Sequence, residues 1–252
     1  MVALMTRYHI GARRLESSLS AYAKRFDFLE VHMQPPDTPA PTLATFRRWR
    51  KQVPPHFDFS VAVGASAAAL RPGRDLDHDL ATALAAADAL QARCMLVATP
   101  TDVTPAPIWR DRLAKVTARI TRDATYVAWE PRGLWETDDA LKLAQQLGVL
   151  LVVDPLRDPA PPGPVFYGRL RALGETRSFG VAALERVVAS IGARRDAYVI
   201  IETPSALAEC KRLRAIAQGG TRKIGGMGRV VRPRDGTPVP PSSLRVKDDE
   251  QE

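Results

Sequence analysis

Residues 126–135 read Tyr-Val-Ala-Trp-Glu-Pro-Arg-Gly-Leu-Trp, an apolar run that ends in charged side chains. The apolar run has the pattern of a strand. Glu130 and Arg132 follow it, and a Pro/Gly turn then leads to Trp135. In a barrel of alternating strands and helices, the carboxyl ends of the strands carry the functional groups. The stretch therefore predicts one barrel strand that delivers a charged pair to the rim.

A strand followed by a connection recurs along the chain at a spacing of about 25–35 residues, as in an eight-stranded barrel. Apolar runs predict strands at 8–10, 28–32, 57–63, 94–98, 126–130, 149–154, 165–169 and 197–201. Helical spacing predicts helices near 17–26, 42–52, 79–91, 108–121, 137–147, 181–191 and 204–218, with a loop over 64–78. The prolines of 158–164 predict an irregular sixth crossover. The pattern favours a (β/α)8 TIM barrel over an open doubly wound sheet, since no GxGxxG motif follows the first strand.

The composition changes after residue 218. Gly and Pro become frequent, no periodic apolar face remains, and the chain ends in a charged run. Such a segment cannot bury enough apolar surface to fold alone. The sequence therefore predicts a barrel domain over 1–218 and a flexible, disordered tail over 219–252.

The overall charge permits two readings. The formal net charge of +8 and pI of about 9.9 suggest an anionic ligand or nucleic acid, but an Arg-rich composition alone gives the same excess. Cys94 and Cys210 have no CxxC or Cys/His spacing and are expected to be buried, inert thiols. No signal peptide and no membrane-spanning run is evident, so a cytoplasmic protein without membrane partners is expected. The oligomeric state is left open.

Each predicted strand has one apolar face and one mixed face, because strand side chains alternate. The apolar faces are expected to pack on the outer helices, which turns the mixed faces into the barrel. Buried charges must pair or bind something. Either they close the barrel as an ion-pair network, for instance Glu30 with Arg169, or they form a rim that binds a polar ligand. The charged residues expected to point inward are Glu30, Glu130, Asp154, Glu202, Arg132, Arg169 and Arg171.

Four segments resemble motifs of one protein family. Residues 26–31 resemble its FD-x-VEIN strand, and Trp49 with 53–61 resembles its W-x-TP-x-F-x-F-x-V stretch. Residues 129–135 resemble E-F-R-x-x-x-W, and 167–171 resemble Y-V-R-L-H. From about residue 8 to about residue 213, the chain resembles the domain-of-unknown-function 72 family (YecE-like proteins). The resemblance implies a TIM barrel and no particular activity, because none is established for that family.

The chain departs from the family pattern at several polar positions. Ala62 stands in place of a Lys, Ala98 in place of a polar residue, and Arg171 in place of a His. The resemblance therefore implies a diverged member. The rim residues that match the family are Glu30, Glu130, Arg132, Trp135 and Arg169.

The first functional hypothesis is a barrel that binds, and in an enzyme transforms, a small anionic compound. Arginine forks bind carboxylates and phosphates, and Glu serves as a general acid or base. Glu30 and Glu130 are the candidate catalytic residues, with no cofactor and no metal. Whether the chain is an enzyme stays open. The candidate ligand-binding residues are Arg132, Arg169, Arg171, Trp135, His32 and Glu202.

Two alternatives belong to other classes. A divalent-metal barrel resembling sugar isomerases or endonucleases would use oxygen and nitrogen ligands, although the nearby arginines would repel a cation. A nucleic-acid or protein-binding module would use the basic helix at 47–51, Arg-Arg-Trp-Arg-Lys. The metal alternative draws on Glu30, His32, Glu130, Asp154 and Glu202.

Overall fold

The computed structural model describes residues 6–12, 15, 18–33, 41–121, 125–172 and 178–219. The chain divides into two compact units, Met1–Gly220 and Thr221–Glu252, and every described residue belongs to the first. The tail predicted over 219–252 lies outside the described residues, apart from Gly219. The boundary near residue 218 stays a prediction.

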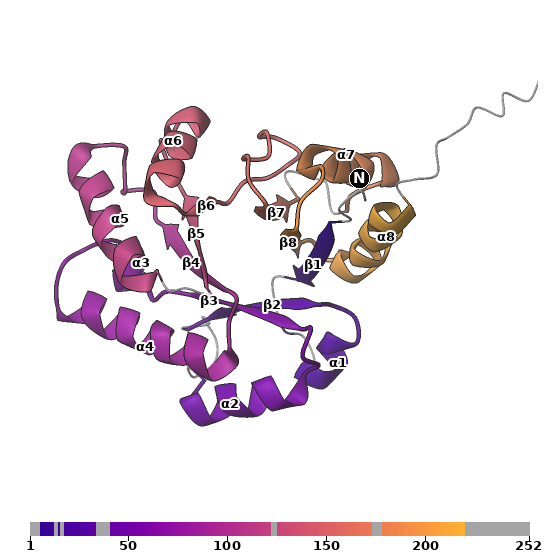
Figure 1. The fold of residues 1–252 in the computed structure, drawn as a ribbon, viewed down its shortest axis with the longest axis horizontal. Coiled ribbons are helices and arrows are strands. Elements are labelled where there is room, and N and C mark those ends of the chain that lie inside the picture. The colour runs from indigo at the N-terminus through magenta and orange to yellow at the C-terminus, as the bar shows by residue number, and fades with distance from the viewer. Residues whose placement is uncertain are drawn as a thin grey trace, which may run out of the picture. The chain divides into compact units, whose positions relative to one another are not determined.

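Eight parallel strands form the centre of the first unit (Figure 1). Five pair in the order β2-β3-β4-β5-β6 and three in the order β1-β8-β7. The strands are β1 (Arg7–Ala12), β2 (Phe28–His32), β3 (Asp58–Ala62), β4 (Cys94–Thr99), β5 (Tyr126–Pro131), β6 (Leu150–Leu151), β7 (Val165–Arg171) and β8 (Asp196–Glu202).

Two seams join the sheets into a closed barrel. At one seam, a parallel bridge pairs Val153 with Gly168, and the Arg169 amide donates to the Val153 carbonyl at 2.9 Å. At the other, the Asp27 amide donates to the Ile10 carbonyl at 3.0 Å. With eight strands in a ring, the predicted TIM barrel is confirmed, and closure leaves no sheet edge.

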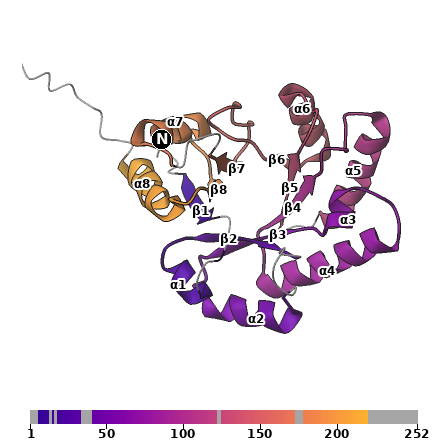
Figure 2. The ribbon, with the colours of Figure 1, turned by 180° about the vertical axis from the view of Figure 1, so that it is seen from behind.

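Helices surround the strands, as views from opposite sides show (Figures 1 and 2). No helix occurs between β6 and β7, over residues 152–164, so the irregular sixth crossover is confirmed. None of the helices in the described part of the chain is long and apolar enough to cross a membrane. The helices are α1 (Leu19–Ala23), α2 (Leu43–Gln52), α3 (Ala65–Ala68), α4 (Arg74–Leu90), α5 (Pro107–Ile120), α6 (Thr137–Leu147), α7 (Val181–Ile191) and α8 (Ala206–Gly219).

Two predicted elements were wrong in detail. The loop expected over 64–78 contains α3 and the first turn of α4. Asp79, expected to begin a helix, instead accepts the Ser66 and Ala67 amide hydrogens at 2.8 and 3.3 Å and so caps α3. The strand expected over 149–154 is only Leu150–Leu151 with a bridge at Val153, because the chain turns at once into the irregular crossover.

The core has two layers. One fills the space between strands and helices, and the other fills the barrel. The second contains the side chains that strand alternation turns inward, which confirms the predicted phase of the strands. Cys94 is buried in the inner layer and Cys210 in the outer one, both as free thiols. The inner layer consists of Phe28, Ala62, Cys94, Leu96, Ala128, Val152, Val165, Tyr167, Tyr198 and Ile200.

Candidate functional site

A group of charged side chains lies at the carboxyl ends of four strands. Strand alternation points these side chains into the barrel. They therefore approach one another on the carboxyl-terminal side of the inner apolar layer. We call this group the mouth network. It consists of Glu30 from β2, Glu130 from β5, Arg169 and Arg171 from β7, Glu202 from β8, and Arg132 just after β5.

Arg169 is the hub of the mouth network. Its side chain is 5% exposed, and its Nη2 lies 2.9 and 2.8 Å from the two carboxylate oxygens of Glu30. The same nitrogen lies 3.1 Å from Glu130 Oε2, and Nη1 donates to Glu202 Oε1 at 2.8 Å. Burial acts to lower the pKa of Arg169, but these carboxylates outweigh burial and raise it well above its usual value. Arg169 is therefore a permanent buried cation that gathers three carboxylates.

Glu30 is held as a carboxylate. Tyr167 Oη donates to its Oε2 at 2.5 Å, and His32 Nε2 lies 2.8 Å from its Oε1. Burial acts to raise the pKa of Glu30, but Arg169, His32 and Tyr167 outweigh it and lower the pKa. The His32 ring is 47% exposed, so it connects the buried Glu30 to the surface.

Glu130 faces three guanidinium groups. Arg171 donates to its Oε1, and the Arg132 Nε lies 3.6 Å from the same oxygen. The other oxygen, Oε2, has the close contact with Arg169 but no hydrogen bond of good geometry within the described structure. Arg171 and Arg132 are 41% and 50% exposed, and Arg171 also donates to Glu202 at 3.2 Å. Glu130 thus lies between one buried cation and two half-exposed ones.

Asp154, expected inward with this group, does not join the mouth network. Its carboxylate accepts the Leu156 amide hydrogen at 3.0 Å and lies 3.7 Å from Arg157. Burial raises its pKa. Asp154 therefore caps the turn after β6; it lies beside the mouth network, but its ion pair is with Arg157 rather than with a member of that network.

Trp135 is fixed against the wall of the mouth. Its indole Nε1 donates to the Val103 carbonyl at 2.8 Å, and its ring meets Trp129 edge to face at 4.9 Å. The Arg110 guanidinium lies 5.7 Å from the ring centre. These contacts fix the Trp135 side chain, which also lines a cavity beside the mouth network.

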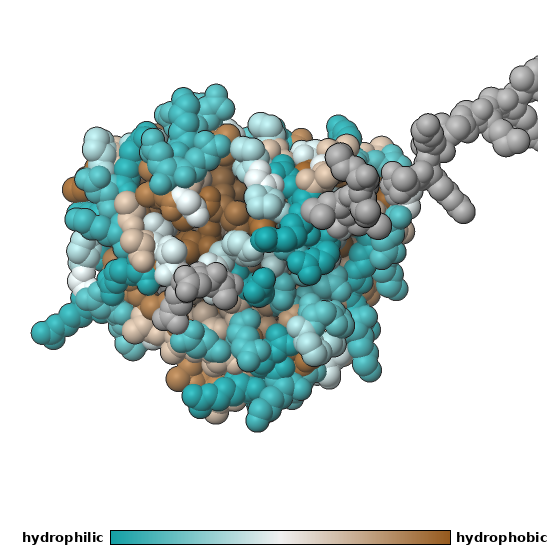
Figure 3. All heavy atoms as spheres, viewed as in Figure 1, coloured by the Kyte–Doolittle hydropathy of each residue, from teal (hydrophilic) through white to brown (hydrophobic). Residues whose placement is uncertain are grey.

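A cavity of about 210 Å³ opens beside the mouth network. In the space-filling view, a hollow with a hydrophobic floor lies next to α6 (Figure 3). Charged groups from β5 and β7 meet apolar side chains from β6 in the cavity wall. The lining includes Glu130, Trp135, Leu151, Val153, Asp154, Arg157, Arg169 and Arg171.

Two supporting residues are missing from the predicted site residues. Strand alternation already places Tyr167 on the inward face with Arg169, and its contact with Glu30 makes it part of the site. Glu209, on α8, is fully buried and accepts the Phe179 amide hydrogen at 2.5 Å and the Thr203 hydroxyl hydrogen. It ties the segment before α7 to the turn before α8. No signal marked it, because an acidic residue on a helix usually faces solvent.

The residues proposed for a metal do not form a ligand set. Each of Glu30, Glu130 and Glu202 has a guanidinium nitrogen within 3.1 Å. The positively charged guanidinium groups therefore already occupy the space that a metal cation would need. Across the part of the chain that the structure describes, no group of three or more His, Cys, Asp or Glu is placed to hold a metal ion.

Comparison with known proteins agrees with this fold. The family described as "Protein of unknown function DUF72" matches residues 4–226. A DUF72 family protein from Enterococcus faecalis superposes with a TM-score of 0.68 at 16% identity, covering 85% of this chain and 99% of that one. Another from Thermotoga maritima gives 0.63 at 15% identity, covering 84% and 99%.

A less similar solved structure has the same fold. A xylose isomerase domain containing protein from Salmonella typhimurium gives a TM-score of 0.55 at 13% identity, covering 86% of this chain and 97% of that one. At such identities the likeness shows the barrel alone. None of the curated proteins compared with the chain matches it. The family match spans most of the sequence, and the chain belongs to the DUF72 family, whose function is unknown.

Proposed function

We propose that the mouth of the barrel binds a small anion through Arg171 and Arg132, with Glu130 as the group that gains or gives a proton. The observation that carries the proposal is the position of Glu130, which lines the cavity between two half-exposed guanidinium groups. A carboxylate or phosphate entering the cavity meets the exposed side of Arg171, which lines it, and Arg132 approaches the same Glu130 oxygen from beyond the lining.

Arg169 has a different role in this proposal from the one expected. Its two Nη nitrogens already contact three carboxylates, and its side chain is almost fully buried. It therefore holds Glu30, Glu130 and Glu202 in position rather than binding the ligand. His32 and Glu202 act through the network in the same way, and Trp135 forms the wall against which the body of the ligand rests.

The charge balance of the mouth network determines what binding requires. Glu30, Glu130 and Glu202 are equal in number to Arg132, Arg169 and Arg171, so the network is neutral with His32 uncharged. An anion added to a neutral, partly buried group carries an uncompensated charge. Proton uptake by Glu130 offsets one unit of that charge and frees Arg171 for the ligand. The protonated Glu130 is then placed as a general acid, and its conjugate base as a general base.

Binding of inorganic sulfate tests the proposal, because sulfate does not titrate near neutral pH. Arg171→Gln removes one charge-assisted contact and is expected to weaken binding by about tenfold or more. Glu130→Gln replaces the carboxylate by a neutral amide of the same shape and is expected to bind sulfate more tightly. Equilibrium dialysis at pH 7 measures both changes.

Glu136→Gln is the matched control, since Glu136 is exposed just before α6 and lies outside the mouth network. Its sulfate affinity is expected to equal that of the unmodified protein. Equal affinity of the Arg171→Gln and unmodified proteins would overturn the assigned role of Arg171. Weaker binding by Glu130→Gln would overturn the role of Glu130.

A further inference from the structure

A second cavity, larger than the first, lies outside the barrel. Its volume is about 440 Å³, within the range of small-molecule sites. It is lined by α2 and the loop that follows it, by the last turns of α4, and by the start of β4, so it lies toward the amino-terminal ends of the strands. We call it the α2–α4 pocket. Its lining includes Arg50, Asp58, Leu84, Ala87, Arg93 and Met95.

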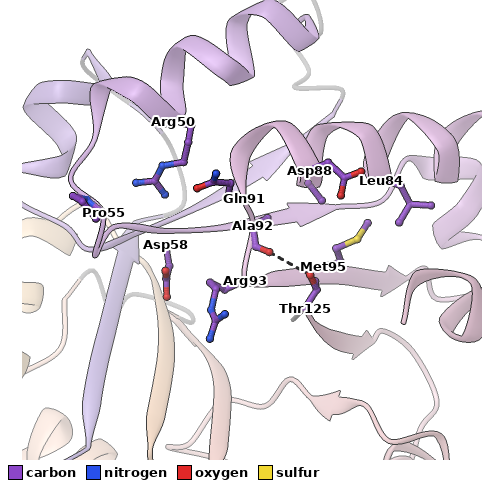
Figure 4. A pocket seen from close by; sticks show the side chains of 11 residues that line it. Arg50, Pro55, Asp58, Leu84, Asp88, Gln91, Ala92, Arg93, Met95 and Thr125 are labelled. Atoms are coloured by element: carbon purple, nitrogen blue, oxygen red, sulfur yellow. Dashed lines mark hydrogen bonds between the residues drawn. The ribbon is translucent and has the colours of Figure 1, made fainter. Parts of the chain in front are cut away.

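The α2–α4 pocket has charged side chains at one end, and at the other it has apolar side chains beside the exposed Asp88. Arg50, Asp58 and Arg93 lie together on one side, whereas Leu84 and Met95 lie on the other (Figure 4). Asp88, which also lines the pocket, lies on the α4 side near Leu84. A ligand that fits this arrangement has a polar group at one end and an apolar body.

Arg50 is held rigidly in the pocket wall. Its Nη1 donates to the Phe57 carbonyl at 2.8 Å and its Nη2 to the Pro54 carbonyl at 2.5 Å, and the guanidinium lies 5.4 Å from the centre of the Phe59 ring. These partners are neutral, in contrast to the three carboxylates around Arg169. Burial lowers the pKa of Arg50, and the Asp58 charge only partly opposes this. Arg50 is therefore a preorganised cation with charge left to satisfy.

The carboxylate beside it is directed away from Arg50. Asp58 Oδ2 accepts a hydrogen bond from Tyr198 Oη at 3.0 Å and lies 3.3 Å from His9 Nδ1. Both partners lie inside the barrel at the amino-terminal ends of the strands, where the His9 and Tyr198 rings stack on each other and Asp58 contacts both. Arg93 is exposed, and the Tyr198 side chain interacts with it. Arg50 and Arg93 thus lie near one carboxylate, Asp58, which already contacts Tyr198 and His9. This end of the pocket therefore carries a net positive charge.

We propose that the α2–α4 pocket is a second ligand site, for a small amphipathic anion whose charged group contacts Arg50 and Arg93. Its apolar body lies against Leu84, Ala87 and Met95. The site is at the opposite end of the strands from the mouth network and shares no residue with it. It is a binding site without catalytic groups, and it stands independently of the function proposed for the mouth.

The need for a charged group and the need for an apolar body can be tested separately with phenyl phosphate, inorganic phosphate and benzyl alcohol. Titration calorimetry with the full chain carrying Arg171→Gln, which weakens anion binding at the mouth, is expected to show that phenyl phosphate binds at least tenfold more tightly than inorganic phosphate at the α2–α4 pocket. Benzyl alcohol, which lacks the charge, is expected to bind more weakly than phenyl phosphate. Equal affinities of phenyl phosphate and inorganic phosphate would overturn the proposal.

Two variants locate the site. Arg93→Gln removes an exposed charge, and Leu84→Gln makes the apolar end polar; each is expected to weaken phenyl phosphate binding about tenfold. Arg119→Gln, an exposed arginine on α5 outside the pocket, is the control and is expected to leave this binding unchanged. Thermal unfolding verifies that each variant is folded. Undiminished binding by folded Arg93→Gln, or absence of phenyl phosphate binding at millimolar concentration, would overturn the proposal.

Discussion

Arg169 contacts carboxylates from three strands, and its partner Glu30 is 139 residues away in the sequence. Removing the guanidinium leaves Glu30, Glu130 and Glu202 close together with too little positive charge. Breaking a buried ion pair from one side typically costs about 3–5 kcal/mol. Arg169→Met is therefore expected to lower the free energy of unfolding by about that amount, measured by urea denaturation.

Arg171→Gln is the comparison for this prediction. Arg171 is 41% exposed, so solvent screens its pairs and the expected loss is about 1 kcal/mol or less. Similar losses in the two variants would show that burial does not distinguish the two arginines.

Glu30 gives the barrel a predicted sensitivity to acid. Arg169, His32 and Tyr167 hold its pKa below the unfolded value in spite of burial. A group with a lowered pKa contributes stability above its unfolded pKa, about 4.3 for Glu, and loses it as the pH falls. The difference in unfolding free energy between the unmodified protein and Glu30→Gln is therefore expected to shrink from pH 6 to pH 3. A difference independent of pH would contradict the lowered pKa.

At the residue scale, the sequence predicted which side chains point inward and suggested the Glu30–Arg169 pair, which the structure confirms, but it left the other pairs open. Strand alternation depends only on the backbone, so it placed Glu30, Glu130 and Arg169 on the inner face. Partner choice depends on the height of each residue in the closed barrel, which local sequence does not encode. Asp154 shows the limit, because the two-residue strand β6 releases it into a turn.

At the scale of elements, the seam between β1 and β2 depends on a glycine. A Cβ built on Gly11 would lie 2.5 Å from the Phe28 carbonyl oxygen, which is backbone and cannot move aside cheaply. Gly11→Ala is expected to destabilise the fold by about 1–3 kcal/mol, as overpacking does. Gly180→Ala, before α7, meets no atom within 4 Å and is the control. Equal unfolding midpoints of the two variants would contradict the close approach at the seam.

Helices with a clear apolar face were predictable almost to the residue, as α6 and α7 show. The short helix α3 was not, because Asp79, which caps it, comes thirteen residues after Ser66 in the chain. An acidic residue in that position looks like the start of the next helix when only neighbouring residues are considered. Long-range caps of this kind are decided by tertiary contacts.

At the scale of the whole molecule, the barrel presents different chemistry at its two ends. The mouth network is neutral and partly buried, whereas the α2–α4 pocket has a cationic end and an apolar end. The family match and the DUF72 structures account for the fold shared with relatives. They do not identify the ligands, which depend on the side chains at each end of the barrel.

Proton uptake on sulfate binding is the decisive test of the role proposed for Glu130 at the mouth. Calorimetry at pH 7 in two buffers of different ionisation enthalpy measures the protons taken up, and Arg93→Gln as the background variant reduces the contribution of the α2–α4 pocket. The proposed role of Glu130 predicts net proton uptake when sulfate binds at the mouth, so that sulfate affinity rises as the pH falls. It also predicts that Glu130→Gln abolishes the uptake. Sulfate binding without proton uptake, or uptake unchanged in Glu130→Gln, would contradict it.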